Sequence, residues 1–488
     1  MTANTLIDLQ EADSLNQMDT LRHWVSVDAG YQRSMRLDRD ASDAGVLAGY
    51  VAQTTCLNAL QTMATHINSS RQRSFTWTGP YGCGKSSLAL VLSSLLGKGP
   101  RRDEAARILS LADEEAVSRA FASREGWKQI LMVGRQASLT DDLAERLKVK
   151  NDGRAVVQAL EKAAEAESEG FILMIDELGK YLEAENASEN AYLLQEIAEA
   201  ANRSSAKFVF LGILHQAVDV YASKLPRTVR DEWAKVQGRF IDIPLLSSSE
   251  ETIELLGHAF AHPHGTPPMS PAFLASVDLV AKAFAKRRPE MVGRIQELLI
   301  ACWPLNPVTT LLLGPISRRK FSQNERSIYS FLSASEPKGF RLFVEGSSTG
   351  LTYDPADYWD YLKENFENAI LTTNESHRWL TAVESVMRAE RTCGEGAVRL
   401  AKAVAIIDLF RTGSGIEASR EVLAAAVNMT VSEVEPLLVE LCERKVIIER
   451  RYAGAFAIFA GSDFDLEAAL KAALEDMGGI DTSTIARY

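Results

Sequence analysis

Strand-like and helix-like segments alternate through the first half of the chain. Apolar runs bounded by polar residues are typical of strands buried on both faces of a sheet. They occupy residues 74–78, 129–133, 170–175, 207–214 and 240–244. Between these predicted strands, apolar residues recur with helical spacing at residues 87–96, 141–167 and 189–202. This alternation predicts a parallel sheet covered by helices.

The second half of the chain has mainly helical periodicity. Residues 251–342 predict a bundle of helices broken by prolines, and an aromatic-rich helix is expected at residues 354–370. From residue 397 onward we predict three helices, the last two separated by the turn at residues 428–430, and then a β-hairpin around the turn at residues 452–454. This order of elements predicts a winged-helix domain.

A phosphate-binding motif follows the first predicted strand. Residues 79–86 read GPYGCGKS and fit the pattern G-x-x-x-x-G-K-[ST] at every fixed position. Glycines let the backbone N–H groups curl around phosphates, and the following helix presents its positive end. We expect Lys85 to reach the β- and γ-phosphates of ATP and Ser86 to bind Mg²⁺. The predicted nucleotide-binding residues are Gly79, Pro80, Tyr81, Gly82, Cys83, Gly84, Lys85, Ser86 and Ser87.

Two adjacent carboxylates end the third predicted strand. Asp176 is expected to hold Mg²⁺, and Glu177 is expected to polarise the attacking water as the catalytic base. Taken alone, the segment also reads as a buried strand followed by an acidic helix cap. The upstream phosphate loop favours the catalytic interpretation, which predicts hydrolysis of the triphosphate.

Three further residues complete the predicted catalytic set. His215 ends the fourth predicted strand, where it would either lie beside the γ-phosphate or be a solvated strand end. Arg239 precedes the fifth strand and would either reach a neighbouring subunit's site or pair locally with Asp231 or Glu232. The third residue, Arg326, depends on the family resemblance described below.

Composition limits the classes of function. A formal net charge of −12 makes the chain as a whole a poor ligand for polyanions, so contact with nucleic acid would need a local basic surface. The five cysteines are scattered and lack C-x-x-C spacing, which fits a reducing cytoplasm rather than a disulfide scaffold or a zinc site. We expect no signal peptide and no membrane span, because the N-terminus is polar and every apolar run is short.

The motifs together resemble an AAA+ ATPase of the initiator, or origin-recognition-like, group over residues 45–343. Several strings also resemble large prokaryotic ATPases of anti-phage defence systems of the bacteriophage-exclusion and phage-growth-limitation kind: WTGPYG (77–82), DELGKYL (176–182), PLNPVT (304–309) and QNERSIYSFL (323–332). The resemblance implies that Arg326 contacts the γ-phosphate from the lid, and that the protein forms oligomers.

On this basis we expect an α/β P-loop NTPase core of AAA+ type, followed by a helical lid and a winged-helix domain. The predicted boundaries are an N-terminal extension at 1–44, the nucleotide-binding core at 45–250, the lid at 251–345, a helical connector at 346–395, the winged helix at 396–462 and a C-terminal helix and tail at 463–488.

Three functions fit these expectations. The first is an ATP-driven switch or motor acting on partner proteins, in a defence system. The second is a DNA-binding initiator or helicase loader, and the third is a nucleotide-bound scaffold that hydrolyses little. The helix expected to read DNA begins with Ser432, Glu433 and Glu435, which favours docking of a protein and leaves Arg450 and Arg451 of the wing as the expected DNA contact.

Overall fold

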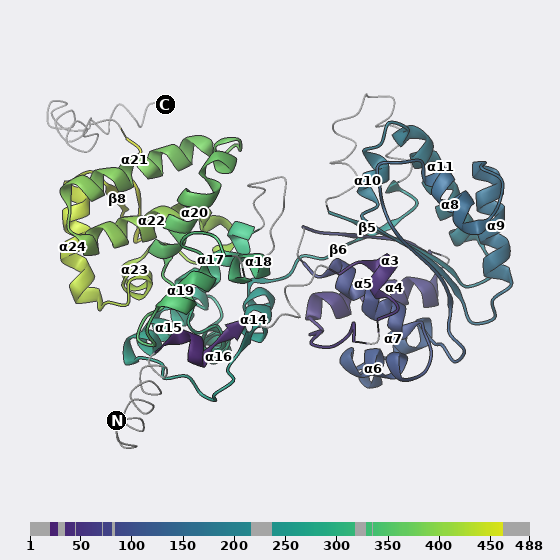
Figure 1. Ribbon diagram of the computed structural model, residues 1–488, viewed down its shortest axis with the longest axis horizontal. Helices are drawn as coiled ribbons and strands as arrows, with labels where there is room; N and C mark the ends of the chain where they lie inside the picture. Colours follow the sequence, from purple (N-terminus) through teal and green to yellow (C-terminus); the bar gives the residue numbers. More distant parts are fainter. Residues whose placement is uncertain are drawn as a thin grey trace, which may run out of the picture.

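The chain folds into two lobes, one built on a β-sheet and one almost entirely helical (Figure 1). The computed structural model describes residues 20–27, 35–43, 45–70, 72–80, 83–215, 237–317, 328–333 and 335–461. The first lobe contains the predicted nucleotide-binding core, and the second contains the predicted lid, connector and winged helix.

A five-stranded parallel sheet forms the centre of the first lobe, with the order β3-β4-β5-β2-β6. Its strands are β2 (Ser74–Thr78), β3 (Lys128–Val133), β4 (Phe171–Asp176), β5 (Phe208–Leu214) and β6 (Ile241–Pro244). The strand that leads into the phosphate loop, β2, therefore lies between β5 and β6 rather than at an edge. This is the predicted α/β core, a parallel sheet in which the phosphate-loop motif follows a central strand.

Helices cover both faces of the sheet (Figure 1). One face carries α3 (Leu37–Asp40), α4 (Thr54–Ser69), α5 (Lys85–Leu95), α6 (Pro100–Ile108), the 3-10 helix η2 (Leu111–Asp113) and α7 (Glu115–Ala120). The other carries α8 (Leu139–Leu147), α9 (Gly153–Glu165), α10 (Gly179–Leu182) and α11 (Ala187–Arg203). Alternate residues of β4 pack into the two layers: Ile172 and Met174 into one, Phe171 and Leu173 into the other.

The single helix predicted at residues 141–167 is wrong, because the chain forms α8 and α9 there. Lys148 ends α8 in the left-handed conformation, with φ of 57°. Asp152 then caps α9, accepting a hydrogen bond from the N–H of Ala155 at 3.1 Å. A left-handed residue followed by a new N-cap interrupts a helix even where the apolar spacing continues.

The second lobe packs its helices around one continuous core. Its first elements are α2 (Leu21–Trp24), β1 (Ser26–Val27), α14 (Ser249–Ala259), β7 (Phe260–Ala261), α15 (Pro271–Phe284), η3 (Pro289–Met291), α16 (Val292–Ala301), α17 (Pro307–Ser317), α18 (Ile328–Ser333) and α19 (Phe340–Gly346). The helices α20 (Pro355–Leu371) and α21 (Ser376–Thr392) follow. Tyr358, Trp359 and Tyr361 of α20 are buried in this core.

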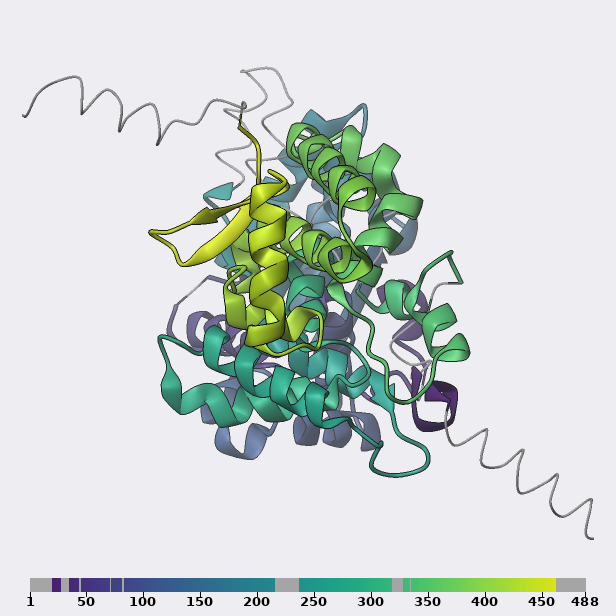
Figure 2. The same ribbon diagram turned by 90° about the vertical axis from the view of Figure 1, so that its left-hand side faces the viewer.

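The last elements of the second lobe have the predicted winged-helix order. They are α22 (Glu395–Ser414), α23 (Arg420–Ala426), α24 (Val431–Glu443) and the antiparallel hairpin of β8 (Ile447–Arg450) and β9 (Ala455–Ile458). Figure 2 shows α24 and the hairpin next to each other on the outside of the lobe. Near its end α22 is broken, because Phe410, Thr412 and Gly413 have non-helical backbone angles.

Two segments join the lobes. The chain passes from β6 into α14, whose capping residue Glu251 accepts hydrogen bonds at 2.7 Å from the N–H and the hydroxyl of Thr55 at the start of α4. At the N-terminus, β1 pairs with β7 in the second lobe, whereas α3 packs on the first lobe. In the part of the chain that the structure describes, no single helix is both long and apolar enough to cross a membrane, although the bent pair α23 and α24 passes this test together.

Candidate functional site

The predicted phosphate loop, the two carboxylates and His215 meet at the carboxyl edge of the parallel sheet. The loop follows β2, Asp176 ends β4, and His215 follows β5, which lies between those two strands. The N–H of Gly79 donates to the carbonyl of Leu214 at 3.3 Å, which holds the start of the loop beside the end of β5. Ligands of open α/β sheets bind outside this edge.

Two glycines of the loop are required by the backbone. A Cβ at position 79 would lie 2.4 Å from the carbonyl oxygen of Leu245, which follows β6. Gly84 has φ of 81° and caps α5, a conformation that glycine adopts without steric cost. Tyr81 and Gly82 lie outside the described residues.

The predicted phosphate-binding lysine points back into the loop. Lys85 begins α5 and is only 4% exposed, and its Nζ donates to the carbonyl oxygens of Gly79 at 2.6 Å and Pro80 at 2.7 Å. Cys83 lies nearby, with its Sγ 3.6 Å from the same Nζ. The ammonium is thus held where the loop would surround a phosphate. Ser87 follows in α5 and is partly exposed.

The two predicted Mg²⁺ ligands lie close together. Asp176 is 3% exposed, and this burial raises the pKa of its carboxyl group. The nearby Ser86 side chain opposes the increase in that pKa. One carboxylate and one hydroxyl fit Mg²⁺, which usually takes its remaining ligands from phosphates and water. Among the described residues there is no cluster of three or more His, Cys, Asp or Glu that could hold a metal by itself.

The predicted catalytic base has an unusual backbone. Glu177 has φ of 51°, in the left-handed region that non-glycine residues rarely adopt, and its N–H donates to Oδ1 of Asp176 at 2.8 Å. Its carboxylate forms an ion pair with Lys180, one turn further along the chain. Such backbone strain is concentrated at functional sites.

His215 lies beside Glu177. Its side chain is 13% exposed, and its Nε2 is 4.0 Å from Oε1 of Glu177. His215 is therefore not a solvated strand end. It lies between the carboxylates and the phosphate loop, because β5 separates β4 from β2.

Arg239 lies at the opposite edge of the sheet. It precedes β6, whose residue Ile241 pairs with Phe75 near the start of β2, whereas the phosphate loop follows the end of β2. Phe75 and the first loop residue, Gly79, are four residues apart along an extended strand, which is about 13 Å. The half-exposed Arg239 forms an ion pair with Glu199 at 2.9 Å. Arg239 is thus remote from the nucleotide site of its own chain. Arg326, Asp231 and Glu232 lie outside the described residues.

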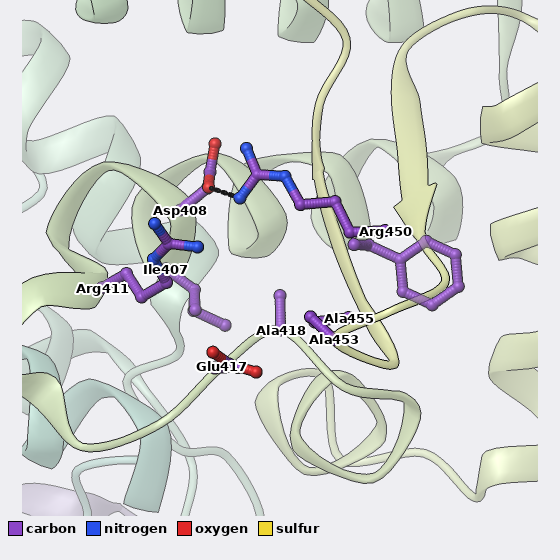
Figure 3. Close-up of a pocket in the computed structure, with 9 residues that line it drawn as sticks. Ile407, Asp408, Arg411, Glu417, Ala418, Arg450, Ala453 and Ala455 are labelled. Atoms are coloured by element: carbon purple, nitrogen blue, oxygen red, sulfur yellow. Dashed lines mark hydrogen bonds and ion pairs between the residues drawn. The ribbon is translucent and has the colours of Figure 1, made fainter. Parts of the chain in front are cut away.

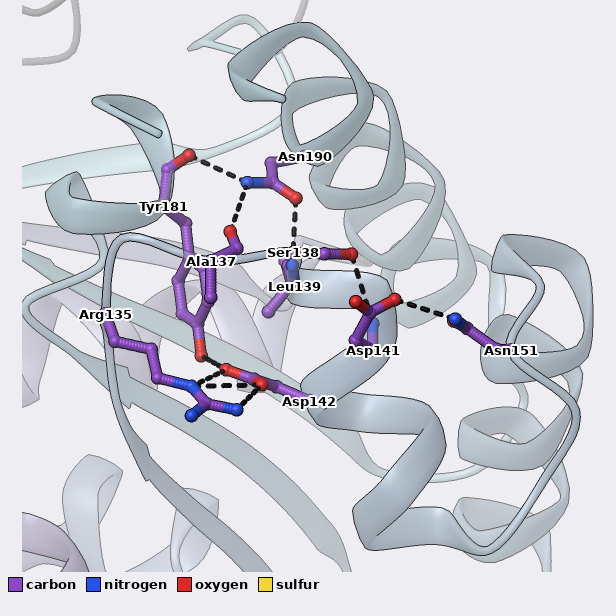
Figure 4. Close-up of polar contacts among 9 residues, drawn as sticks. All are labelled: Arg135, Ala137, Ser138, Leu139, Asp141, Asp142, Asn151, Tyr181 and Asn190. Atoms are coloured by element: carbon purple, nitrogen blue, oxygen red, sulfur yellow. Dashed lines mark hydrogen bonds and ion pairs between the residues drawn. The ribbon is translucent and has the colours of Figure 1, made fainter. Parts of the chain in front are cut away.

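A polar network holds the segment after Glu177 against the loop that follows β3 (Figure 4). The Tyr181 hydroxyl donates to Asp142 at 2.5 Å, and Asp142 also pairs with Arg135. The buried Asn190 amide donates to the carbonyls of Tyr181 at 2.8 Å and Ala137 at 3.0 Å, and accepts from the N–H of Leu139 at 2.9 Å. This network fixes α10, the helix that carries Lys180.

Sequence reasoning missed several residues around the carboxylates. Gly134 donates its N–H to the carbonyl of Asp176 at 2.7 Å, and a Cβ there would lie 2.2 Å from the carbonyl oxygen of Glu177. Lys180 was visible only as part of the DELGKYL string. The ion pair with Asp38 raises the pKa of Arg36, and Glu177 adds a smaller effect, which places this guanidinium near the site. No sequence motif indicates Gly134 or Arg36, because the carboxylates that they lie near are far away along the chain.

Comparison with known proteins finds matches among solved structures only, at low identity. No protein-family model and no curated protein matches the chain. Among solved structures, it is similar to the ORC1 protein of Aeropyrum pernix in complex with DNA, at 15% identity, with 89% of this chain and 95% of that chain covered and a TM-score of 0.30.

Two structures of the A. pernix ORC2 protein also match. The ADPNP-ADP complexes have 11% identity, 90% and 99% coverage of this chain and that chain and a TM-score of 0.34. The ADP form has 11% identity, 88% and 96% coverage and a TM-score of 0.32. At TM-scores this low, the likeness carries no weight for function, and the assignment of the fold rests on the strand order and the position of the phosphate loop.

Proposed function

We propose that this protein is an ATP-hydrolysing AAA+ protein whose nucleotide state drives work on partner proteins. The observation that supports this proposal best is the meeting of Lys85, the Ser86–Asp176 pair and Glu177 at one sheet edge. These are the groups that phosphoryl transfer to water requires: a cation for the phosphates, oxygen ligands for a metal and a base beside them.

Each residue has a distinct role in the proposed reaction. Lys85 binds the β- and γ-phosphates, giving up its contacts with the loop carbonyls. Ser86 and Asp176 hold Mg²⁺, which when bound neutralises phosphate charge. Glu177 orients the attacking water and accepts its proton. His215, 4.0 Å from Glu177, is suited to register whether the γ-phosphate is present.

The experiment compares ATP turnover and ADP affinity in the wild type, Glu177→Gln and Glu183→Gln. Glu183 is an exposed carboxylate at the end of α10, so it is a matched control. We expect Glu177→Gln to lower kcat by about 10²- to 10⁴-fold while ADP affinity changes little. Equal rates in the wild type and Glu177→Gln would show that Glu177 is not the base, and negligible wild-type turnover with tight ADP binding would support the scaffold alternative.

The charges of the C-terminal module favour proteins over DNA as the partner. Glu433 caps α24 in a capping box with Thr430, so a carboxylate occupies the start of the helix expected to read DNA. Arg420 pairs with Glu435 at 2.7 Å and with Glu449 at 2.8 Å. Arg450 of the wing pairs with Asp408 at 3.2 Å and so is directed toward α22.

The DNA-binding initiator alternative is tested by titrating duplex DNA at increasing salt concentration. Lack of affinity near physiological salt would exclude that alternative, whereas tight binding with a steep salt dependence would favour it. The resemblance to anti-phage ATPases adds the proposal that the partner proteins belong to a defence system. The neighbouring genes provide the check, because a replication locus would contradict that assignment.

A further inference from the structure

A cavity remote from the phosphate loop lies in the C-terminal part of the second lobe. It has a volume of about 310 Å³ and lies between α21, the end of α22 and the hairpin β8–β9. Arg378, Arg411 and Arg450 contribute to its wall, together with His377 and a single acidic residue, Asp408. We call this cavity the arginine pocket.

The arginine pocket has an excess of positive charge in an acidic protein. Its lining carries three arginines and one carboxylate, whereas the whole chain has a net charge of −12. Arginine is well suited to phosphate because its planar fork donates two parallel hydrogen bonds to neighbouring oxygens. Asp408 pairs with Arg450, and Glu375, outside the lining, pairs with Arg378, so Arg411 is the arginine of the lining that has no ion pair among the described residues.

Two of the arginines are held in place by the protein. Arg450 donates to Oδ1 of Asp408 at 3.2 Å, and Arg378 donates to the carbonyl of Asp408 at 2.7 Å and to Glu375 at 3.0 Å. Both therefore converge on Asp408, which fixes their positions.

Arg411 is different. Within the described part of the chain, its exposed side chain makes no hydrogen bond or ion pair. Figure 3 shows its guanidinium beside Asp408, which bonds Arg450, with Glu417 nearby in the adjoining small cavity. Arg411 thus presents an uncommitted set of donors next to two arginines that are already positioned.

The remainder of the lining indicates the kind of ligand. Thr381 and Thr412 add hydroxyl groups, and Ala382, Leu409 and Ile458 add apolar surface. A volume of about 310 Å³ lies at the lower end of the range for small-molecule sites. The combination suits a compact molecule with a phosphate group and an uncharged body, of about mononucleotide size.

We propose that the arginine pocket binds a small phosphate-bearing ligand, with Arg411 as its principal donor. Duplex DNA fits less well, because Glu375 and Glu417 flank the arginines and an extended polyanion would lie against them. The proposal does not depend on ATP hydrolysis at the phosphate loop.

The test is calorimetric titration of the 488-residue chain with AMP, inorganic phosphate and citrate at low salt. All titrations use the Lys85→Ala background, so that binding at the phosphate loop does not contribute. Arg411→Gln is the test variant, and Arg391→Gln, at an exposed arginine of α21 outside the pocket, is the matched control. Thermal unfolding of each variant verifies that it is folded.

We expect AMP to bind, Arg411→Gln to weaken this binding at least about tenfold, and Arg391→Gln to leave it within about twofold. Absence of binding by AMP and phosphate, or equal AMP affinity in both arginine variants, would overturn the proposal. Tighter binding of citrate would indicate a carboxylate site instead. Arg411-dependent binding of duplex DNA without binding of AMP would indicate a nucleic-acid surface instead.

Discussion

Replacing Gly134 by alanine tests whether the loop after β3 positions the proposed catalytic carboxylates. A Cβ at this position would lie 2.2 Å from the carbonyl oxygen of Glu177, 2.9 Å from its carbonyl carbon and 3.3 Å from the carbonyl oxygen of Asp176. These are backbone atoms, so no side-chain rotation relieves the contact. The two segments must separate by roughly 1 Å to restore ordinary van der Waals distances.

The size of the effect follows from that displacement. Overpacking of this kind lowers the free energy of unfolding by about 1–3 kcal/mol. A shift of roughly 1 Å in catalytic groups lowers turnover about 10²-fold. ADP affinity should change only a few-fold, because Lys85 belongs to α5 and the loop lies between β2 and α5, outside the displaced segment.

The assay measures ATP turnover, ADP affinity and urea denaturation for the wild type and Gly134→Ala. Gly293→Ala is the control, because a Cβ at Gly293 in α16 would meet nothing within 4 Å. Alanine in a helix should raise stability there by about 0.5–1 kcal/mol without changing turnover. If Gly134→Ala keeps both its stability and its turnover within about twofold, the positioning role assigned to Gly134 is wrong. The stability readout remains valid even if the wild type does not hydrolyse ATP.

Two other predictions concern Arg239 and Asp354. If Arg239 acts on a neighbouring subunit, mixing Arg239→Ala with Lys85→Ala subunits should restore part of the lost ATP turnover, and specific activity should rise with protein concentration. Concentration-independent turnover without recovery would instead leave Arg239 with only its local ion pair to Glu199. Burial raises the pKa of Asp354 to about 6, so between about pH 4 and 6 the folded protein keeps a proton that the unfolded chain releases. The free energy of unfolding of the wild type relative to Asp354→Asn should therefore fall as pH rises across this window, by about 3 kcal/mol, in urea titrations at several pH values; a pH-independent difference would refute the assignment.

The parts of the fold that the sequence predicts well are those specified by neighbouring residues. The strand at residues 74–78 is observed with the same bounds, because its limits are set by the arginine before it and the glycine loop after it. The break between α8 and α9 was not predicted. The residue in the left-handed conformation there is Lys148, and lysine is not a residue type that indicates this conformation. Helical periodicity alone does not register such a break.

The contacts around the site were less predictable, because they join residues far apart in the chain. The closeness of Ser86 to Asp176 follows from their motifs and from the parallel sheet. By contrast, nothing in the sequence distinguishes Gly134 from other residues that follow a strand. Glycine is required there because β3 pairs with β4, which places position 134 against the backbone of Glu177. The ion pair of Arg450 could not be predicted either, because its partner Asp408 belongs to a different element, α22.

The same packing connects the phosphate loop to the second lobe. Gly79 lies against the carbonyl of Leu245, whose N–H donates to the carbonyl of Thr78 at 2.7 Å. Leu245 follows β6 and is only three residues before Ser248, which caps α14, the first helix after the sheet. The loop therefore contacts the segment that leads into the second lobe directly, with no helix or strand between them. Under the proposed function, a change in the loop on hydrolysis would act on this segment. Since β2 lies between β5 and β6, the loop is bounded by His215 on one side and by this segment on the other. These contacts give the proposed switch a direct physical connection between the nucleotide site and the second lobe.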